Sequence, residues 1–242
     1  MTSFVTDGGI LVPAVTAETM REVDRIAIEE HTPNLFQMME NAGRSLALAA
    51  IDHLGAGWRE VRIAVCAGSG GNGGGGICAA RHLANHGGDV VLVLSEPARL
   101  SPVIDQQLHV YQKTSGRIDR AGSFEPGLIL DAVVGYGLKG APRGPARELI
   151  EWMGERATPV ISLDVPSGLD STTGETPGVV VDATTTVTLA LPKTGLVSPI
   201  AGGLWLADLG IPNGVYAMAG IPLPRSLFDA GYRIHLRRQQ TS

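Results

Sequence analysis

The sequence predicts an α/β protein: a three-layer α/β/α sandwich with a mostly parallel central sheet. From residue 61 onward, short runs rich in Val, Ile and Leu alternate with helix-like segments. Such continuous apolar runs are typical of parallel strands covered on both faces. The chemically distinctive residues follow these runs, where ligands bind in sheets of this kind. With 242 residues, of which 44% are hydrophobic and 18% charged, the chain can form a substantial core.

The expected elements follow one another without an internal repeat or a long linker. Two helices come first, at 17–31 with Thr16 as its cap and at 35–54 with Asn34 as its cap. Strands are expected at 61–68, 89–96, 128–135, 159–168, 183–192 and 203–212, and later helices at 77–87, 101–116 and 144–156. We therefore expect a single domain over residues 1–242, with a core at about 15–212 and an extension at each end.

The overall composition argues against several classes of partner. The formal net charge of −5 gives no sign of binding to nucleic acid or to a membrane surface. No signal-peptide pattern is present, and no apolar run reaches the ~18 residues of a membrane span. Cys66 and Cys78 lack metal-ligand spacing, so we expect buried thiols in a cytoplasmic protein. The basic segment 235–242 is expected to be a solvated tail, and His82 and His86 to lie on a solvated helix face.

A glycine-rich run at 68–76 joins the first predicted strand of the sheet to a helix, which does not suit a flexible linker. It contains GxGxxG at Gly68, Gly70 and Gly73, and Glu96 ends the next strand, so an NAD-dependent dehydrogenase is one alternative. Glycine costs a helix about 1 kcal/mol relative to alanine. We therefore expect the helix to begin near Ile77, after a long loop whose bare N–H groups could bind an anion.

Oxygen-bearing side chains follow several of the predicted strands. Asn72 could serve a ligand, or it could be a turn residue. Asp131 ends one strand, and an unpaired carboxylate would be costly to bury there. Ser167 follows another strand, and these three side chains would suit a monovalent or hard divalent cation. Asp164 would then remain as a candidate general acid or base. Lys139 would either meet a phosphate or lie on the surface.

Six motifs follow one another in a recognisable order over about residues 15–212. They are MRxxDxxAI (20–28), MENAGR (39–44), GSGGNGGGGICAARHL (68–83), DAVVGYGLKG (131–140), LDVPSGLD (163–170) and ALPKTGL…ADLGIP (190–212). Together they resemble the YjeF N-terminal domain family, the NAD(P)H-hydrate epimerases. The resemblance implies a Rossmann-like fold, usually a homodimer. It also implies an isomerase that interconverts the R and S forms of hydrated NADH and NADPH, a repair step that works with a separate dehydratase.

The resemblance also implies roles for individual residues. Asn72, Asp131 and Ser167 match potassium ligands, and the K⁺ ion would be structural. Asp164 matches an aspartate that contacts the substrate, and it is the expected catalytic acid–base group. The expected substrate-binding residues, including those around the phosphates, are Gly71, Asn72, Gly73, Gly74, Gly75, Gly135, Tyr136, Gly137, Leu138, Lys139, Gly140, Ala141 and Asp164.

Two glycines depart from the family pattern and leave two hypotheses open. Gly71 stands where the family has asparagine, and Gly75 stands where it has aspartate. The leading hypothesis is an active epimerase that relies on Asp164. The alternative is a catalytically degenerate member that binds a nucleotide and acts as a regulatory or interaction module. The dehydrogenase alternative lacks a Tyr-x-x-x-Lys pattern or a catalytic histidine.

Overall fold

The protein is an α/β sandwich built on one mixed sheet, as the sequence predicts. The computed structural model describes residues 3–31 and 33–239. The strands in this part of the chain are β1 (Ser3–Thr6), β2 (Leu11–Pro13), β3 (Arg62–Ala67), β4 (Asp89–Leu94), β5 (Arg117–Ile118), β6 (Leu128–Ala132), β7 (Val160–Leu163), β8 (Thr185–Leu189), β9 (Gly203–Ala207) and β10 (Arg233–Arg238). They form one ten-stranded sheet in the order β2-β1-β10-β9-β8-β7-β6-β3-β4-β5.

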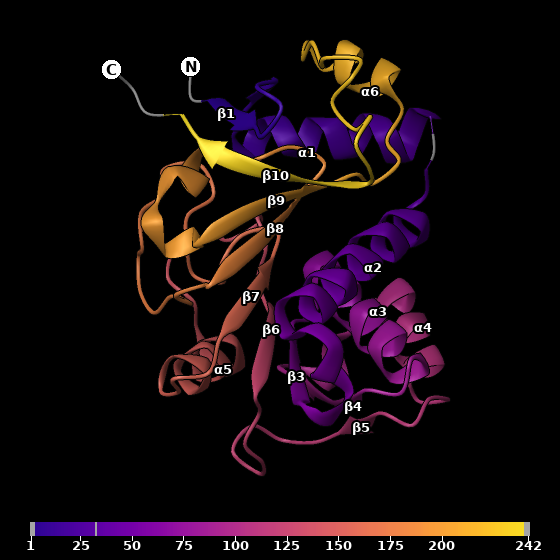
Figure 1. Cartoon of the computed structure of the whole chain (residues 1–242), viewed down its shortest axis with the longest axis vertical. Helices are drawn as coiled ribbons and strands as arrows, with labels where there is room; N and C mark the ends of the chain where they lie inside the picture. The colour runs from indigo at the N-terminus through magenta and orange to yellow at the C-terminus, as the bar shows by residue number, and fades with distance from the viewer. Residues whose placement is uncertain (1–2, 32, 240–242) are drawn as a thin grey trace.

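The sheet is mostly parallel. Every pairing from β9 across to β5 is parallel. The pairings of β10 with β9, of β1 with β10 and of β2 with β1 are antiparallel (Figure 1). The carboxyl ends of the parallel strands therefore meet at one edge of the sheet, which is where the expected site residues lie.

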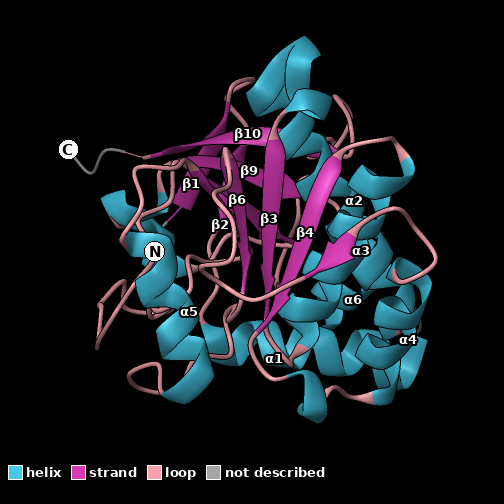
Figure 2. Ribbon diagram, turned by 90° about the horizontal axis from the view of Figure 1, so that it is seen from below, coloured by secondary structure: helices cyan, strands magenta, loops and turns pink. Residues whose placement is uncertain are grey.

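Helices cover both faces of the sheet. The main helices are α1 (Ala17–Ile26), α2 (Leu35–Leu54), α3 (Gly71–Asn85), α4 (Pro102–Tyr111), α5 (Gly144–Gly154) and α6 (Asn213–Met218). Shorter turns are η1 (Ala27–His31), η2 (Gly55–Glu60), η3 (Pro97–Arg99), η4 (Thr194–Val197) and η5 (Pro199–Ala201). Figure 2 shows α5 on one side of the sheet and α2, α3 and α4 on the other. Within the described residues, none of these helices combines the length and apolar character needed to cross a membrane.

Local sequence signals explain where the first two helices begin. The Thr16 side chain accepts a hydrogen bond from the Thr19 N–H at 3.2 Å. Asn34 and Gln37 cap α2 reciprocally, each side chain accepting from the other residue's backbone N–H. Both predicted caps are confirmed, and α2 spans the predicted 35–54.

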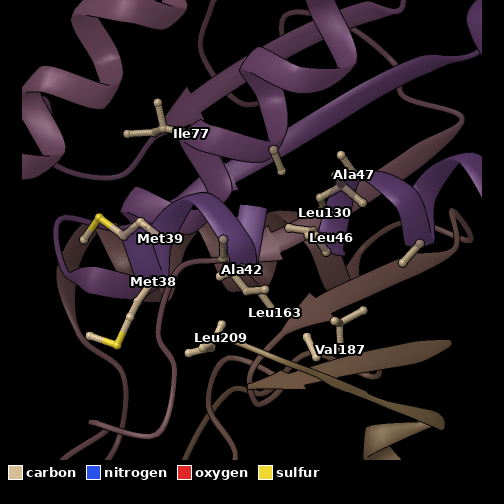
Figure 3. Close-up of a cluster of buried hydrophobic side chains, with 14 of the residues drawn as sticks. Met38, Met39, Ala42, Leu46, Ala47, Ile77, Leu130, Leu163, Val187 and Leu209 are labelled. Atoms are coloured by element: carbon tan, nitrogen blue, oxygen red, sulfur yellow. The ribbon is translucent and has the colours of Figure 1, made fainter. Parts of the chain in front are cut away.

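Side chains on the two faces of β3 pack into two separate hydrophobic clusters of the core. Ile63 and Val65 pack toward α2 and α3, whereas Ala64 and Cys66 pack with the apolar residues of α5. Cys66 and Cys78 are both free and buried, as expected. Figure 3 shows part of the larger cluster, in which Leu46 of α2 and Leu130 of β6 lie close together. This alternation is the physical basis of the three layers.

The expected start of the third helix is wrong. Helix α3 begins at Gly71, six residues before Ile77, so most of the glycine run is helical. A Cβ on Gly73 would lie only 1.8 Å from the Gly68 carbonyl oxygen, and one on Gly76 would lie 2.5 Å from the Ala132 Cβ. Close packing of α3 on the sheet thus requires glycine and outweighs its poor helix propensity. The expected long loop before Ile77 is therefore absent.

The basic C-terminal segment is not a solvated tail as far as residue 239. Its residues 235–238 belong to β10, in which Ile234 and Leu236 face the core at 7% and 2% exposure. Arg238 donates hydrogen bonds to the carbonyl oxygens of Leu196, Gly202 and Ser198 at 2.9–3.0 Å. Apolar residues alternate with charged ones along β10, which is a pattern typical of a strand, but the many basic residues of this segment favoured the interpretation as a solvated tail. Residues 240–242 lie outside the described part of the chain.

Candidate active site

A cavity of about 590 Å³ opens at the carboxyl ends of the parallel strands. Residues that follow β3, β6, β7 and β8 form one side of it, and residues of α1 and α2 form the other. Its volume is in the range of sites that hold a cofactor-sized ligand. A neighbouring cavity of about 300 Å³ shares Arg21 of α1 with it.

The structure brings some of the expected site residues to this cavity and leaves others outside it. Gly71, Asn72, Gly135, Tyr136, Gly137 and Asp164 line the cavity. Gly73, Gly74 and Gly75 are buried inside α3, while Asp131 and Ser167 lie fully buried behind the wall. Leu138 lines the neighbouring cavity, and Lys139, Gly140 and Ala141 line neither.

The two glycines that depart from the family pattern have different surroundings. A Cβ on Gly71 would meet no atom within 4 Å. A Cβ on Gly75 would lie 2.8 Å from Leu163 Cδ2 and 3.6 Å from the Ala42 Cβ. Leu163 and Ala42 both line the cavity and lie next to each other in Figure 3. A side chain at position 75 would therefore compete with Leu163 for the cavity wall.

Asp131 is completely buried and fully hydrogen-bonded. Its Oδ2 accepts from the Ser162 hydroxyl and the Ser167 N–H, both at 2.8 Å. Its Oδ1 accepts from the Ser167 hydroxyl at 2.6 Å and the Val133 N–H at 3.2 Å. Burial raises the pKa of this carboxyl, and the hydrogen bonds act in the opposite direction. Because a carboxylate has about four acceptor sites, none is left over, and Asp131 ties together the turns after β6 and β7.

The side-chain amide of Asn72, in contrast to the Asp131 carboxyl, lacks hydrogen-bond partners among the described residues. Both polar atoms of this amide are buried. A Cβ on Gly135 would lie 3.1 Å from Asn72 Cγ and 2.9 Å from Asp164 Oδ2, so these three residues meet at one point of the wall. An unsatisfied buried amide costs about 1–3 kcal/mol. This side chain is therefore poised to receive a ligand, an ion or a water molecule.

Asp164 combines an unusual backbone with a buried ion pair. Its φ of +68° lies in the left-handed region that non-glycine residues rarely adopt. Its Oδ1 accepts a hydrogen bond from the Lys193 ammonium, which is 1% exposed. Its Oδ2 accepts from the Tyr136 N–H at 2.9 Å. The strained turn therefore holds a carboxylate at the cavity wall with each oxygen in a fixed direction.

A second carboxyl reaches the cavity from α1. Asp24 Oδ2 accepts a hydrogen bond from the Tyr136 hydroxyl at 2.5 Å. Burial raises the pKa of Asp24, and the Tyr136 hydrogen bond and the Lys193 charge act against that rise. Lys193 Nζ lies 5.6 Å from the centroid of the Tyr136 ring. The cavity thus contains two carboxyls, one tyrosine and one ammonium, with Asp164 bonded to Lys193 and Tyr136, and Asp24 bonded to Tyr136.

Sequence reasoning did not assign Asp24 or Lys193 to the site. Both lie in recognised motifs, MRxxDxxAI and ALPKTGL; Lys193 directly follows the predicted strand 183–192, whereas Asp24 lies within a predicted helix. The signal that could have found Lys193 is its position four residues after β8. No comparable signal exists for Asp24, because an acidic residue on an amphipathic helix usually faces solvent.

His82 is not on a solvated helix face, contrary to expectation. Its Nε2 lies 2.8 Å from Glu40 Oε1, and its side chain is 20% exposed. Arg81 contacts Glu40 Oε2 at 2.5 Å and Cys78 Sγ at 3.3 Å. The ligand-type atoms of Glu40, Cys78 and His82 lie within 4.8 Å of one another. Since the Arg81 guanidinium already bridges them, this group is a hydrogen-bonded network joining α2 to α3.

The donor set expected for potassium fits that ion in chemistry and partly in arrangement. Amide, carboxylate and hydroxyl oxygens are hard ligands, as an alkali ion requires. Asn72 Oδ1 is free to bind an ion. The Ser167 hydroxyl contacts Asp131 and accepts from the Val134 N–H at 2.8 Å. An ion could therefore bind Asn72 directly, but Asp131 and Ser167 would have to give up existing hydrogen bonds to join it.

Comparison with known proteins identifies the family. The model of the family described as YjeF-related protein N-terminus matches residues 35–195. The chain belongs to this family. It is 49% identical to an NAD(P)H-hydrate epimerase of Dehalogenimonas lykanthroporepellens, over 96% of each chain. It is also 34% identical to an NAD(P)H-hydrate epimerase of Weissella koreensis, over 83% of this chain and 93% of that one.

Longer relatives and a solved structure agree with this placement. The chain is 35% identical to the bifunctional NAD(P)H-hydrate repair enzyme Nnr of Moorella thermoacetica, over 94% of this chain but only 46% of that enzyme. The crystal structure of the yeast protein YNL200c superposes with a TM-score of 0.78 at 22% identity. It covers 94% of this chain and 100% of that one. This likeness supports the Rossmann-like α/β/α fold.

Proposed function

We propose that this family member is an NAD(P)H-hydrate epimerase, which interconverts the R and S forms of hydrated NADH and NADPH. Family membership supports the reaction class. The observation that carries the proposal for this chain is Asp164, a carboxylate held at the wall of a nucleotide-sized cavity by Lys193 and the Tyr136 N–H. Proton transfer by a positioned carboxyl is the form of catalysis this reaction needs.

The chemistry makes modest demands on the protein. In the hydrated nicotinamide ring, C6 bears a hydroxyl and is bonded to the ring nitrogen. The nitrogen lone pair can expel the hydroxyl and leave an iminium-like intermediate, which water can attack from either face. A carboxyl that assists departure and return typically contributes about 10²–10⁴-fold. No covalent nucleophile is required, and Asp164 supplies the carboxyl.

The remaining cavity residues suit recognition of the nucleotide. Gly71 at the N-terminus of α3 and Gly137 after β6 line the cavity, and a Cβ on either would meet no atom within 4 Å, so their backbone can be approached by an anion without side-chain obstruction. We propose that the substrate phosphates bind there. We also propose that K⁺ binds at Asn72, with Asp131 and Ser167 as further ligands, and supplies a structural positive charge beside the phosphates.

We extend the proposal to the setting of the reaction. We propose that the protein works in the cytoplasm as a homodimer, on both hydrated NADH and NADPH. Its two buried, unpaired thiols suit a reducing compartment. Because the bifunctional relatives are named as repair enzymes and are about twice as long, a separate NAD(P)H-hydrate dehydratase is the expected functional partner.

A coupled assay tests the function directly. Purified protein is mixed with the R form of hydrated NADH and an S-specific dehydratase, and the recovery of NADH is followed. The proposal expects recovery well above the uncatalysed rate. No acceleration, with tight binding of the hydrated nucleotide, would instead support the degenerate alternative that Gly71 and Gly75 motivate.

Potassium is tested separately by ion exchange. We expect K⁺ to raise the melting temperature and the rate relative to an equal concentration of Na⁺. Asn72→Ala should remove most of that difference, since Asn72 offers the free ligand atom. Equal melting curves in the two salts would contradict the assignment, whatever the activity.

A further inference from the structure

Asp24 places a second carboxyl at the cavity, in addition to that of Asp164. It lines the cavity, and its hydrogen bond from the Tyr136 hydroxyl engages only Oδ2. Among the described residues, no partner is recorded for its Oδ1. The carboxyl therefore has one oxygen held by a neutral donor and one available to a ligand in the cavity.

The position of Asp24 is fixed by the way α1 is attached to the rest of the site. Just before α1, Val15 donates from its N–H to the Pro192 carbonyl oxygen and accepts from the Thr194 N–H, both at 2.9 Å. The first residue of α1, Ala17, donates to the Thr172 hydroxyl at 3.0 Å. The two Val15 bonds flank Lys193 on both sides. The helix that carries Asp24 is thus tied directly to the segment that carries the partner of Asp164.

The two carboxyls lie at opposite ends of one tyrosine. The Tyr136 N–H donates to Asp164, and the Tyr136 hydroxyl donates to Asp24. In inverting glycosidases, two carboxyls about 6.5–9.5 Å apart leave room for both a reacting carbon and a water molecule. Asp24 and Asp164 likewise lie at two separate points of the cavity wall, one hydrogen-bonded at each end of Tyr136. Such a placement suits a reaction in which a hydroxyl leaves C6 and a water molecule arrives at C6.

Asp164 and Asp24 have different electrostatic surroundings. Asp164 is ion-paired with Lys193, as a proton acceptor requires. Asp24 has only a neutral hydrogen-bond donor, and burial raises its pKa; the Tyr136 hydrogen bond and the Lys193 charge act against that rise, and the Asp164 charge adds to it. The other titratable groups around Asp24 are Arg21 on its own helix and Tyr216 of α6, which packs against α1. A carboxyl paired with an ammonium and a carboxyl hydrogen-bonded by a neutral hydroxyl are suited to act as base and acid.

We propose that Asp24 is a second catalytic residue, which protonates the departing hydroxyl while Asp164 accepts a proton from the incoming water. This proposal rests on the proposed epimerase function. In the first step the Asp24 proton moves to the C6 hydroxyl, the C6–O bond breaks, water leaves, and the ring nitrogen lone pair forms the C=N bond. In the second step a water oxygen bonds to C6 on the other face, and the C=N electron pair returns to nitrogen. The proton of that water moves to Asp164.

One turnover therefore moves a proton from Asp24 to Asp164, with no oxidant or reductant involved. The resulting protonation state is the one needed for the reverse conversion, and exchange with solvent restores the first state. Each direction of the epimerisation thus uses one of the two protonation states of the pair.

The test compares Asp24→Asn with Asp208→Asn in the full chain, because Asp208 is a nearby aspartate outside the cavity. Both directions of epimerisation are followed from pH 5 to 9 by separating the two epimers. For the wild type we expect kcat in one direction to fall as pH rises and Asp24 loses its proton. Asp24→Asn should lower kcat by about 10²–10⁴-fold, leave KM within a few-fold, and abolish that limb. Asp208→Asn should leave kcat and the limb unchanged.

Tyr136→Phe gives a second, independent measurement. The Tyr136 hydrogen bond lowers the pKa of Asp24, so its loss should move the limb to higher pH while the ring remains in place. This variant also decides the matter if Asp24→Asn does not fold. An unmoved limb in Tyr136→Phe, or a wild-type profile in Asp24→Asn, would overturn the assignment of Asp24 alone. An inactive wild type would overturn the proposed function and this proposal with it.

Discussion

Asp131 and Asp164 occupy equivalent places in the sequence pattern but have different surroundings in the structure. Each comes at the end of a short apolar strand, in adjacent parallel strands of the sheet. Asp131 lies within β6 and is enclosed by four hydrogen-bond donors from three residues. Asp164 lies one residue beyond β7, adopts a left-handed backbone and faces the cavity.

The turn after the strand, rather than the strand itself, therefore decides what a strand-end carboxylate does. The turn after β6 donates the Val133 N–H back to Asp131 and so closes around it. The turn after β7 leads to Ser167, which also binds Asp131, and leaves Asp164 with one ammonium and one N–H. One carboxylate is therefore a structural centre for both turns, and the other is available to a substrate.

The largest effect is expected from Asp164→Asn. We expect kcat to fall by about 10²–10⁴-fold. Because the buried Lys193 loses its counter-charge, the free energy of unfolding should also fall by about 3–5 kcal/mol. Urea unfolding and the coupled assay measure the two effects. The double variant Asp164→Asn/Lys193→Met separates them, since it should regain stability but not activity. Full activity in the double variant would show that Asp164 is as structural as Asp131.

Asp131→Asn should lower stability strongly and kcat only slightly. The substituted amide group would face donors from Ser162 and Ser167, so we expect the free energy of unfolding to fall by about 3 kcal/mol. The kcat of the folded fraction should stay within about 10-fold of wild type, well above the value for Asp164→Asn. A loss of kcat as large as that of Asp164→Asn, in a protein of unchanged stability, would place Asp131 in the catalytic machinery and remove the distinction.

Gly75→Asp tests whether a third carboxylate at the cavity wall would act structurally, as Asp131 does, or in catalysis, as we propose for Asp164. Its Cβ would press on Leu163, and its charge would enter an apolar part of the wall. We expect a loss of about 2 kcal/mol in stability and no gain in rate. Gly71→Asn is the matched control, because its side chain would enter open space and should change stability by less than about 0.5 kcal/mol. A large gain in rate from Gly75→Asp would indicate that the glycine is a catalytic lesion.

The smallest effect is expected from Ser162→Ala. This change removes one of the donors to Asp131 and leaves the others in place. We expect the free energy of unfolding to fall by about 1 kcal/mol, with kcat unchanged. Thermal melts with and without a bound nucleotide would measure it. A change in kcat would mean that the hydrogen bonds around Asp131 control the cavity wall directly.

Much of the fold could be predicted from the sequence, because the parallel core consists of uninterrupted apolar runs. Helix α2 and both N-terminal caps were also predictable, since their signals are local. The start of α3 was not, because the packing of Gly73 and Gly76 on the sheet outweighs their low helix propensity. Strand β10 was missed for a related reason: its alternating Ile234 and Leu236 are set among arginines and a histidine.

The candidate site was predictable to the extent that its residues follow strands. Asn72, Asp164 and the Gly135–Gly137 turn do line the cavity, and Asp131 does bind Ser167. The sequence did not indicate that Asp131 would be saturated while Asn72 is unsatisfied, because that depends on how two turns close. Asp24 comes from a helix more than a hundred residues distant from Tyr136, so only the tertiary structure brings them together.

Strand β10 has a consequence for how the protein is made. It lies between β1 and β9 in the sheet, so the N-terminal hairpin reaches the rest of the sheet only through the last strand of the described chain. As the polypeptide leaves the ribosome, β1 and β2 must wait, with an unpaired edge, until residues 233–238 have been synthesised. The parallel strands have their partners earlier, so assembly of the nascent chain should finish with the two ends of the described sequence joining side by side.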